Sequence, residues 1–182
     1  MKNNNKIICI AGKNSIGISG LNHVLKTYSN KFQILALCDD NDDGVDRSQP
    51  SFLKYAKNNN VKVVNIDQLY DLKSLYFISL EYFKLINTTK FKSKKLFNIH
   101  FSLLPAYKGM YTSAHPILND ERESGCTFHL INDRIDTGDI IFQKSFKIHP
   151  DDFCSSVYHK YLTCGINLVY EKLDFLINDE YT

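Results

Sequence analysis

Short apolar runs separated by polar turns mark the first hundred residues of the chain. Four of them are typical of buried strands, because each is only a few residues long and is bounded by turn-forming residues. These runs are Ile7–Ala11, Phe32–Cys38, Val61–Val64 and Leu75–Leu80. A short fifth strand is predicted at Phe97–His100.

Helical spacing of apolar residues appears between these strands. Leu21, Val24 and Leu25 recur at helical spacing after a turn predicted at Gly12–Gly17, and a second helix is predicted with Pro50 in its first turn. Strands that alternate with helices favour parallel pairing with right-handed crossovers. The pattern therefore predicts an α/β fold, a Rossmann-like and mostly parallel twisted sheet with helices on both faces.

The pattern changes after Leu104. A short helix is expected within Thr112–Asn119, and Cys126–Ile131 and Ile140–Ile148 are predicted to be antiparallel strands at the sheet edge. An apolar stripe with helical spacing predicts a long C-terminal helix, with Asp151 or Asp152 as its N-cap. We expect one catalytic domain over residues 1–182.

Composition limits the functional class. The chain has 182 residues, 43% of them hydrophobic, and a formal net charge of +2, which is typical of a globular protein without the basic excess that a nucleic-acid partner requires. The sequence has no run of about 18 apolar residues, so no membrane span is predicted. It also has no signal-peptide pattern, so a cytoplasmic protein is expected. The five scattered cysteines are expected to be reduced, and their spacing does not predict a metal site.

Three polar residues are the candidates for catalysis. Asn98 and His100 are two apart on one predicted strand, so their side chains share a face at the carboxyl end, where open α/β sheets bind ligands. Asp136 lies in a predicted turn, where an aspartate alone is read as a turn residue.

The segment from Asn98 to Pro105, Asn-Ile-His-Phe-Ser-Leu-Leu-Pro, together with the later Asp136-Thr-Gly138, resembles the folate-dependent formyltransferase family. The resemblance implies the formyltransferase fold and 10-formyltetrahydrofolate as one-carbon donor. In such chemistry an amine attacks the formyl carbon, and Asn98 and a protonated His100 donate hydrogen bonds to the oxyanion. Asp136 favours and orients the charged imidazole.

The resemblance also implies a folate site. It is expected to use main-chain groups just after the fourth strand and the loop around Asp136. The residues so assigned are Ser79, Leu80, Glu81, Tyr82, Asp133, Ile135 and Gly138.

Among family members, the local sequence is most similar to sugar-nucleotide N-formyltransferases of the dTDP-4-amino-4,6-dideoxyglucose type, which act in surface-glycan biosynthesis. Lys13 adds a charge near an expected phosphate position, although an exposed, solvated lysine is the alternative. The expected substrate contacts are Lys13, Asn14, Lys108, Met110, Tyr111, Thr112, Tyr158 and Tyr161. Tyr158 and Tyr161 are open to a second interpretation, ordinary packing of a helix face.

Other functions stay open from the sequence. Formylation of a 3-amino sugar nucleotide or of glycinamide ribonucleotide is the alternative within the family, and a folate-binding module without catalysis is the alternative outside it. The extension that relatives carry beyond the last helix is expected to be absent, so a monomer and a homodimer both remain open. His115 is expected to line the substrate side or the surface, without a catalytic role.

Overall fold

The computed structural model describes residues 6–181, which group into two compact units that meet in the chain between Phe97 and Asn98. The single domain over residues 1–182 stays a prediction, and its outermost residues lie outside the described part. No helix within residues 6–181 is long and apolar enough to cross a membrane.

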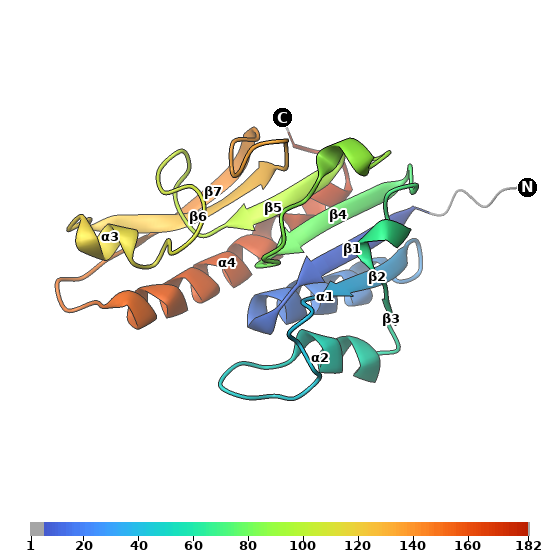
Figure 1. Ribbon diagram of the computed structural model, residues 1–182, viewed down its shortest axis with the longest axis horizontal. Coiled ribbons are helices and arrows are strands. Elements are labelled where there is room, and N and C mark those ends of the chain that lie inside the picture. The colour runs from blue at the N-terminus through green and yellow to red at the C-terminus, as the bar shows by residue number, and fades with distance from the viewer. Residues whose placement is uncertain (1–5, 182) are drawn as a thin grey trace, which may run out of the picture. The chain divides into compact units, whose positions relative to one another are not determined.

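The first unit contains four parallel strands in the order β3-β2-β1-β4. Figure 1 shows them beside helices α1 and α2. The strands are β1 (Ile7–Gly12), β2 (Gln33–Cys38), β3 (Lys62–Val63) and β4 (Leu75–Leu80). The alternation of strand and helix thus gave the parallel order that the pattern predicted.

Helix α1 (Asn14–Tyr28) packs its apolar side on β1, β2 and β4. It begins at Asn14, so the turn predicted at Gly12–Gly17 is wrong beyond its first residues. Gly20 explains the close approach of helix and strand, because a Cβ there would lie 2.2 Å from Leu80 Cδ1. Asn14 and Ser15, which were predicted to lie in the turn, are the first two residues of the helix.

Helix α2 (Phe52–Asn58) begins two residues after Pro50. Ser51 is its N-cap, and its hydroxyl accepts from the Lys54 amide at 2.9 Å. Pro50 therefore precedes the cap and is not in the first turn. Two single-turn 3₁₀ segments, Ile66–Gln68 and Thr88–Lys90, complete the connections.

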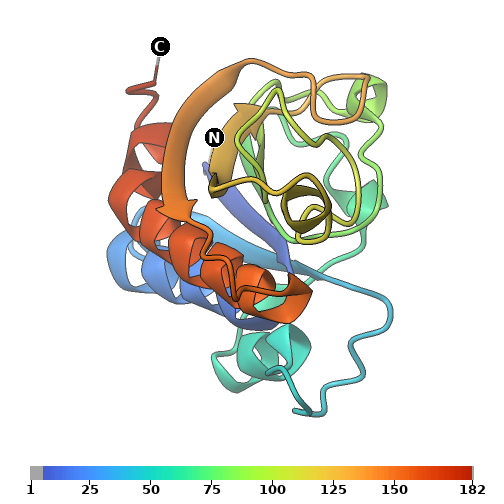
Figure 2. The same ribbon diagram turned by 90° about the vertical axis from the view of Figure 1, so that its left-hand side faces the viewer.

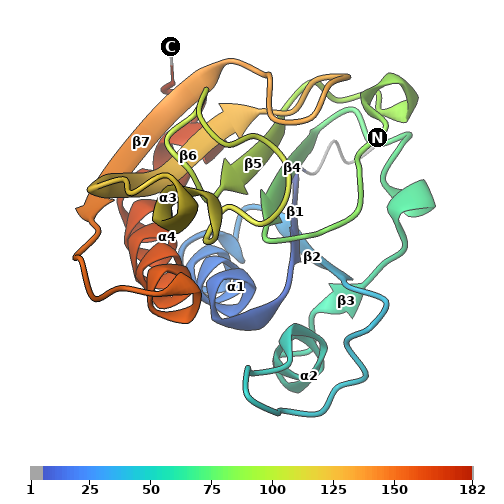
Figure 3. The ribbon, with the colours of Figure 1, turned by 60° about the vertical axis from the view of Figure 1, so that its left-hand side comes forward.

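The second unit contains strands in the order β5-β6-β7 and the long helix α4 (Figure 3). Strand β5 (Leu96–His100) starts two residues before the unit boundary, and β6 (Glu123–Leu130) pairs antiparallel with β7 (Ile140–Lys147). The short helix α3 covers His115–Leu118, inside the range predicted for it.

Helix α4 (Cys154–Ile177) packs on β6 and β7, and Figure 2 shows it running beside β7. Its N-cap is Phe153, so the expectation of Asp151 or Asp152 is wrong. Asp152 is used elsewhere: its carboxylate accepts from the His149 amide at 2.7 Å and pairs with Lys160.

Candidate active site

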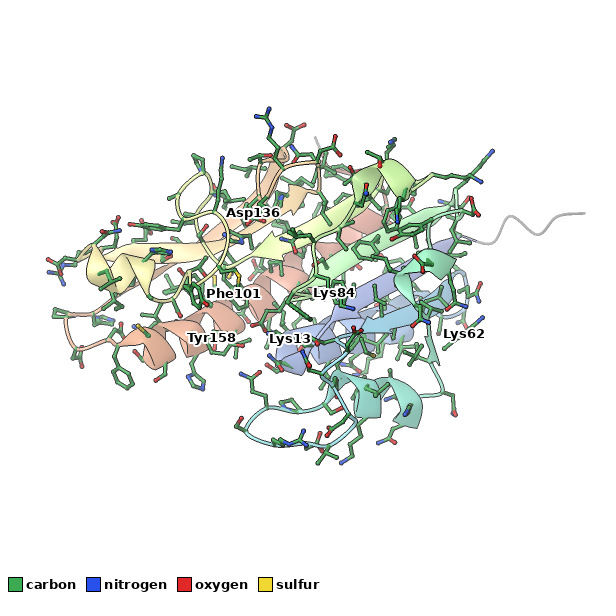
Figure 4. All side chains as sticks on the ribbon, in the orientation of Figure 1. Lys13, Lys62, Lys84, Phe101, Asp136 and Tyr158 are labelled. Atoms are coloured by element: carbon green, nitrogen blue, oxygen red, sulfur yellow. The ribbon has the colours of Figure 1, made fainter. Side chains whose placement is uncertain are left out.

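The three residues predicted for catalysis all lie in the second unit and are brought together there. Asn98 and His100 are on β5, and Asp136 is in the turn between β6 and β7, where Figure 4 labels it. Asp136 Oδ2 lies 3.3 Å from His100 Nδ1. Both side chains are about nine-tenths buried, with 9% of His100 and 12% of Asp136 exposed.

Two backbone features place the Asp136 carboxylate. Its own φ is 48°, the left-handed region that aspartate tolerates better than most residues. The Gly109 amide donates to Asp136 Oδ2 at 2.9 Å. This hydrogen bond ties the loop after β5 to the turn that carries the carboxylate.

The loop after β5 is held by Thr127 on β6. The Thr127 hydroxyl donates to the Ser102 carbonyl at 2.7 Å and accepts from the Leu104 amide at 3.1 Å. Gln143 on β7 donates to the Leu104 carbonyl at 2.9 Å. Side chains from two strands therefore hold the backbone of this loop.

His100 is oriented by two oppositely placed acceptors. Its Nε2 lies 2.8 Å from the Tyr107 carbonyl, which only accepts, so this nitrogen carries a proton. In the neutral ring Nδ1 is then bare and faces Asp136. A second proton taken up at Nδ1 forms a charge-assisted contact with the carboxylate.

Burial lowers the pKa of His100, and His129 adds to that, while Asp136 and the Tyr107 carbonyl oppose it. The net direction is downward, so burial favours the neutral imidazole over the charged one. The protonated His100 expected from the sequence stays a prediction for the reacting complex.

Burial raises the pKa of the Asp136 carboxyl, but the approach of His129, the charge of His100 and the Gly109 amide outweigh it. The pKa of Asp136 therefore lies below its ordinary value. The carboxylate is charged at neutral pH and is available to stabilise a positive charge on His100.

Sequence reasoning missed His129. It lies on β6 with 2% exposure, and its Nε2 is 3.1 Å from Asn98 Nδ2 and 3.5 Å from Asp136 Oδ1. The available signal was the alternation of Thr127 and His129, two polar residues on one face of an apolar strand.

The residues predicted for folate lie in both units. In the first, Ser79 and Leu80 end β4 as buried residues, Tyr82 is 8% exposed, and Glu81 has a φ of 62°. In the second, Asp133 and Ile135 are exposed in the Asp136 turn.

Gly138 is the remaining residue predicted for the folate site, and the structure explains why a glycine stands there. A Cβ at this position would lie 1.7 Å from the Leu130 carbonyl oxygen. The turn can therefore pass this close to β6 only with glycine.

The residues predicted for the substrate also divide between the units. In the first, Lys13 Nζ lies 3.8 Å from Glu81 Oε1, and Asn14 Nδ2 donates to Glu81 Oε2 at 3.2 Å. In the second, three of them are exposed and Thr112 is half-buried. The exposed ones are Lys108, Met110 and Tyr111.

Tyr161 corrects the prediction of a substrate contact. It is fully buried, its hydroxyl lies 2.6 Å from Ser124 Oγ, and it donates to the Thr112 carbonyl at 3.2 Å. Its ring stacks on Phe101 at 5.3 Å. The packing interpretation is right for Tyr161, because apolar neighbours and internal acceptors satisfy the whole side chain.

Tyr158 is half-buried, with its ring 6.2 Å from that of Phe101; both are labelled in Figure 4. Its substrate contact stays a prediction. His115 stacks on the Tyr107 ring at 5.5 Å, which gives it a supporting position beside the loop.

A cavity of about 330 Å³ lies elsewhere in the second unit, between β7 and α4. Lys144, Lys160 and Cys164 help to line it, and none of the predicted site residues does. Both lysines are already paired, with Glu171 and Asp152. Buried polar groups converge instead at the His100–Asp136 pair, which stays the predicted site of the chemistry.

Comparison with known proteins identifies the family. Residues 2–173 match the family described as formyl transferase. The bifunctional polymyxin resistance protein ArnA of Wigglesworthia glossinidia brevipalpis is 34% identical over 129 residues, covering 69% of this chain and 19% of that protein. A methionyl-tRNA formyltransferase of Endomicrobium trichonymphae is 31% identical over 135 residues, covering 69% and 43%.

Two solved structures share 44% identity with the chain. WlaRD, described as a sugar 3N-formyl transferase with dTDP and 5-N-formyl-THF, superposes with a TM-score of 0.93 and 98% of this chain covered. An N-formyltransferase of Helicobacter canadensis, in complex with folinic acid and dTDP-3-aminofucose, gives 0.92 and 96%. The chain spans 65% of the length of both. These likenesses confirm the predicted fold class.

Proposed function

Because the chain belongs to the formyl transferase family, we propose that it moves a formyl group from 10-formyltetrahydrofolate to the amine of a nucleotide-linked amino sugar. The observation that carries the proposal is the buried His100–Asp136 pair beside Asn98 in a family member. The two neighbours at 44% identity, with a folate derivative and dTDP or a dTDP-sugar bound, support the substrate class.

The proposed reaction forms one C–N bond and breaks another. The sugar amine attacks the formyl carbon, and its electron pair passes to the formyl oxygen as the tetrahedral intermediate forms. The intermediate collapses when the bond to folate N10 breaks. The proton lost by the amine ends on N10, and in this proposal His100 carries it.

The residues share this work according to their geometry. In the charged ring, the proton on His100 Nδ1 faces the Asp136 carboxylate. The Nε2–H group, which donates to the Tyr107 carbonyl in the structure, also donates to the formyl oxygen in this proposal. The Asn98 amide supplies the second donor. Donors aimed at a developing oxyanion typically contribute a few kcal/mol each.

The position of the acceptor amine is the finer part of the proposal. The sequence favoured dTDP-4-amino-4,6-dideoxyglucose. Of the two neighbours at 44% identity, one is described as a sugar 3N-formyl transferase and the other is in complex with dTDP-3-aminofucose. We therefore propose a dTDP-linked 3-amino sugar as the acceptor. In the same proposal Lys13, held by Glu81, contacts the pyrophosphate.

A panel of acceptors tests the substrate. The protein is incubated with 10-formyltetrahydrofolate and either dTDP-3-aminofucose, dTDP-4-amino-4,6-dideoxyglucose or glycinamide ribonucleotide, and products are weighed by mass spectrometry. We expect one formyl mass on the 3-amino sugar. Product only on the 4-amino sugar would restore the first expectation, and product only on the ribonucleotide would refute the sugar proposal.

A further inference from the structure

His129 is a buried histidine that touches two of the three predicted catalytic residues. Only 2% of its surface is exposed. Nε2 lies 3.1 Å from Asn98 Nδ2 and 3.5 Å from Asp136 Oδ1, and Nδ1 lies 2.7 Å from the Leu130 carbonyl oxygen. The ring is therefore fixed at both nitrogens.

The Leu130 contact determines which nitrogen carries the proton. A carbonyl oxygen only accepts, so Nδ1 is the protonated nitrogen of the His129 ring. In the neutral ring Nε2 is then an acceptor. The Asn98 amide nitrogen, at 3.1 Å, is nearer to Nε2 than Asp136 Oδ1, which at 3.5 Å lies beyond the usual range for an N–H···O hydrogen bond.

The acceptor at Nε2 in turn fixes the Asn98 carboxamide. Only the amide nitrogen of Asn98 can donate to a bare ring nitrogen, so its carbonyl oxygen cannot occupy that place. One N–H of the amide is held by His129, and the other N–H is left to point elsewhere. A flipped amide would present an acceptor where the reaction needs a donor.

The charged and titratable groups around His129 come from two other segments. Asp136 approaches from the β6–β7 turn, and the His100 ring on β5 is 6.5 Å away between centroids. The residue paired with His129 across β7 is Ile140, which has no charge. Asp136 and His100 are thus the titratable side chains that contact or face His129 within residues 6–181.

We propose that His129 is a positioning residue for formyl transfer, which holds the Asn98 amide with an N–H directed at the formyl oxygen. This inference rests on the proposed function. His129 does not touch the reacting atoms: it acts through Asn98, in the way that outer residues orient a catalytic group.

Two substitutions separate this role from simple support of the turn. His129→Gln keeps an acceptor near the Nε2 position and loses the donor to Leu130, whereas His129→Asn keeps a donor near the Nδ1 position and loses the acceptor for Asn98. We expect kcat to fall about 10- to 100-fold in His129→Asn with KM for both substrates nearly unchanged. His129→Gln should retain kcat within a few-fold.

The reverse order, with His129→Asn active and His129→Gln inactive, would show that the bond to Leu130 is what matters and would overturn the proposal. Introduced into Asn98→Ala, His129→Asn should lower kcat no further, because the residue acts through Asn98. An additional loss of 10-fold or more in that background would also overturn it.

Nitrogen NMR of the labelled wild-type chain gives a readout that does not depend on activity or on the folding of variants. We expect a proton on Nδ1 of the His129 ring and none on Nε2. A proton on Nε2 would contradict the inference. If the wild type transfers no formyl group but shows the Nδ1–H form, the proposed function fails and the His129–Asn98 contact stands.

Discussion

Polar side chains predicted to bind ligands are arranged differently in the two units. In the first, Lys13 and Asn14 share the Glu81 carboxylate, and the Lys13 side chain is 34% exposed. In the second, Asp136 is buried between a histidine and a backbone amide.

Burial explains what each arrangement is suited to. A partly exposed ion pair exchanges easily with a charged ligand, because water already screens it. A buried carboxylate has lost its water, so it acts strongly on the pKa of its neighbour and keeps a fixed direction. On this ground we propose binding for the group around Lys13 and chemistry for the group around Asp136.

The largest expected effect is on the buried cluster. Asp136→Asn removes the charge that stabilises an imidazolium at His100, so we expect kcat to fall about 100- to 10,000-fold, measured by product formation. Asp139→Asn, in the same turn and exposed, is the matched control and should keep wild-type kcat. Near-full turnover in Asp136→Asn would remove the chemical role from this cluster.

Gly138→Ala comes next. The added Cβ would lie 1.7 Å from the Leu130 carbonyl oxygen, so the Asp136 turn has to move, and we expect a loss of about 1–3 kcal/mol in the free energy of unfolding. Denaturant unfolding measures it, together with kcat.

Gly44→Ala controls for backbone strain alone, because its φ is +86° and its nearest contact is 3.9 Å away. If both substitutions lower stability equally while kcat is unchanged, the tight approach of the turn to β6 does not position Asp136.

Lys13→Ala tests the first cluster. Loss of a cation from the pyrophosphate should raise KM for the nucleotide sugar roughly 10-fold with kcat preserved. Lys62→Ala, on exposed β3, should leave both constants unchanged (Figure 4 labels both lysines). An unchanged KM in Lys13→Ala would favour the interpretation of an exposed, solvated lysine.

These two clusters also show how far the sequence predicts the structure. The motif identified Asn98, His100 and Asp136, and the strand Leu75–Leu80 was predicted with its observed ends. The predicted helix starts were wrong where neighbouring residues compete. Proline and aspartate are both common at helix starts, but the caps are Ser51, next to Pro50, and Phe153, next to Asp152. Local preference alone does not decide between neighbouring cap candidates.

The contacts that join distant segments could not be predicted. The hydrogen bond from Gly109 to Asp136 and the approach of His129 to Asn98 depend on how loops fold back on strands. Tyr161 was assigned to the substrate because helix position does not say which face is buried. Its internal hydroxyl bonds are a tertiary property.

The smallest expected effect is the dependence of stability on pH. Burial lowers the pKa of folded His100 below its ordinary value of 6.5, so the unfolded chain binds the proton first. The corresponding stability is present above pH 6.5 and is lost as pH falls through the folded pKa.

We therefore expect Tm to drop between about pH 7 and pH 5, and to drop less in His100→Gln. Equal slopes in the two proteins would show that burial does not shift this group.

The most direct test of the account follows a ¹³C-labelled formyl group from 10-formyltetrahydrofolate in the wild type and in His100→Ala. We predict that the wild type places the labelled carbon on the nitrogen of dTDP-3-aminofucose, detected by NMR as a formamide, and that His100→Ala gives almost none. Equal transfer by both proteins would contradict the catalytic role of the buried cluster, and no transfer to any amino sugar by a folate-binding wild type would contradict the proposed function itself.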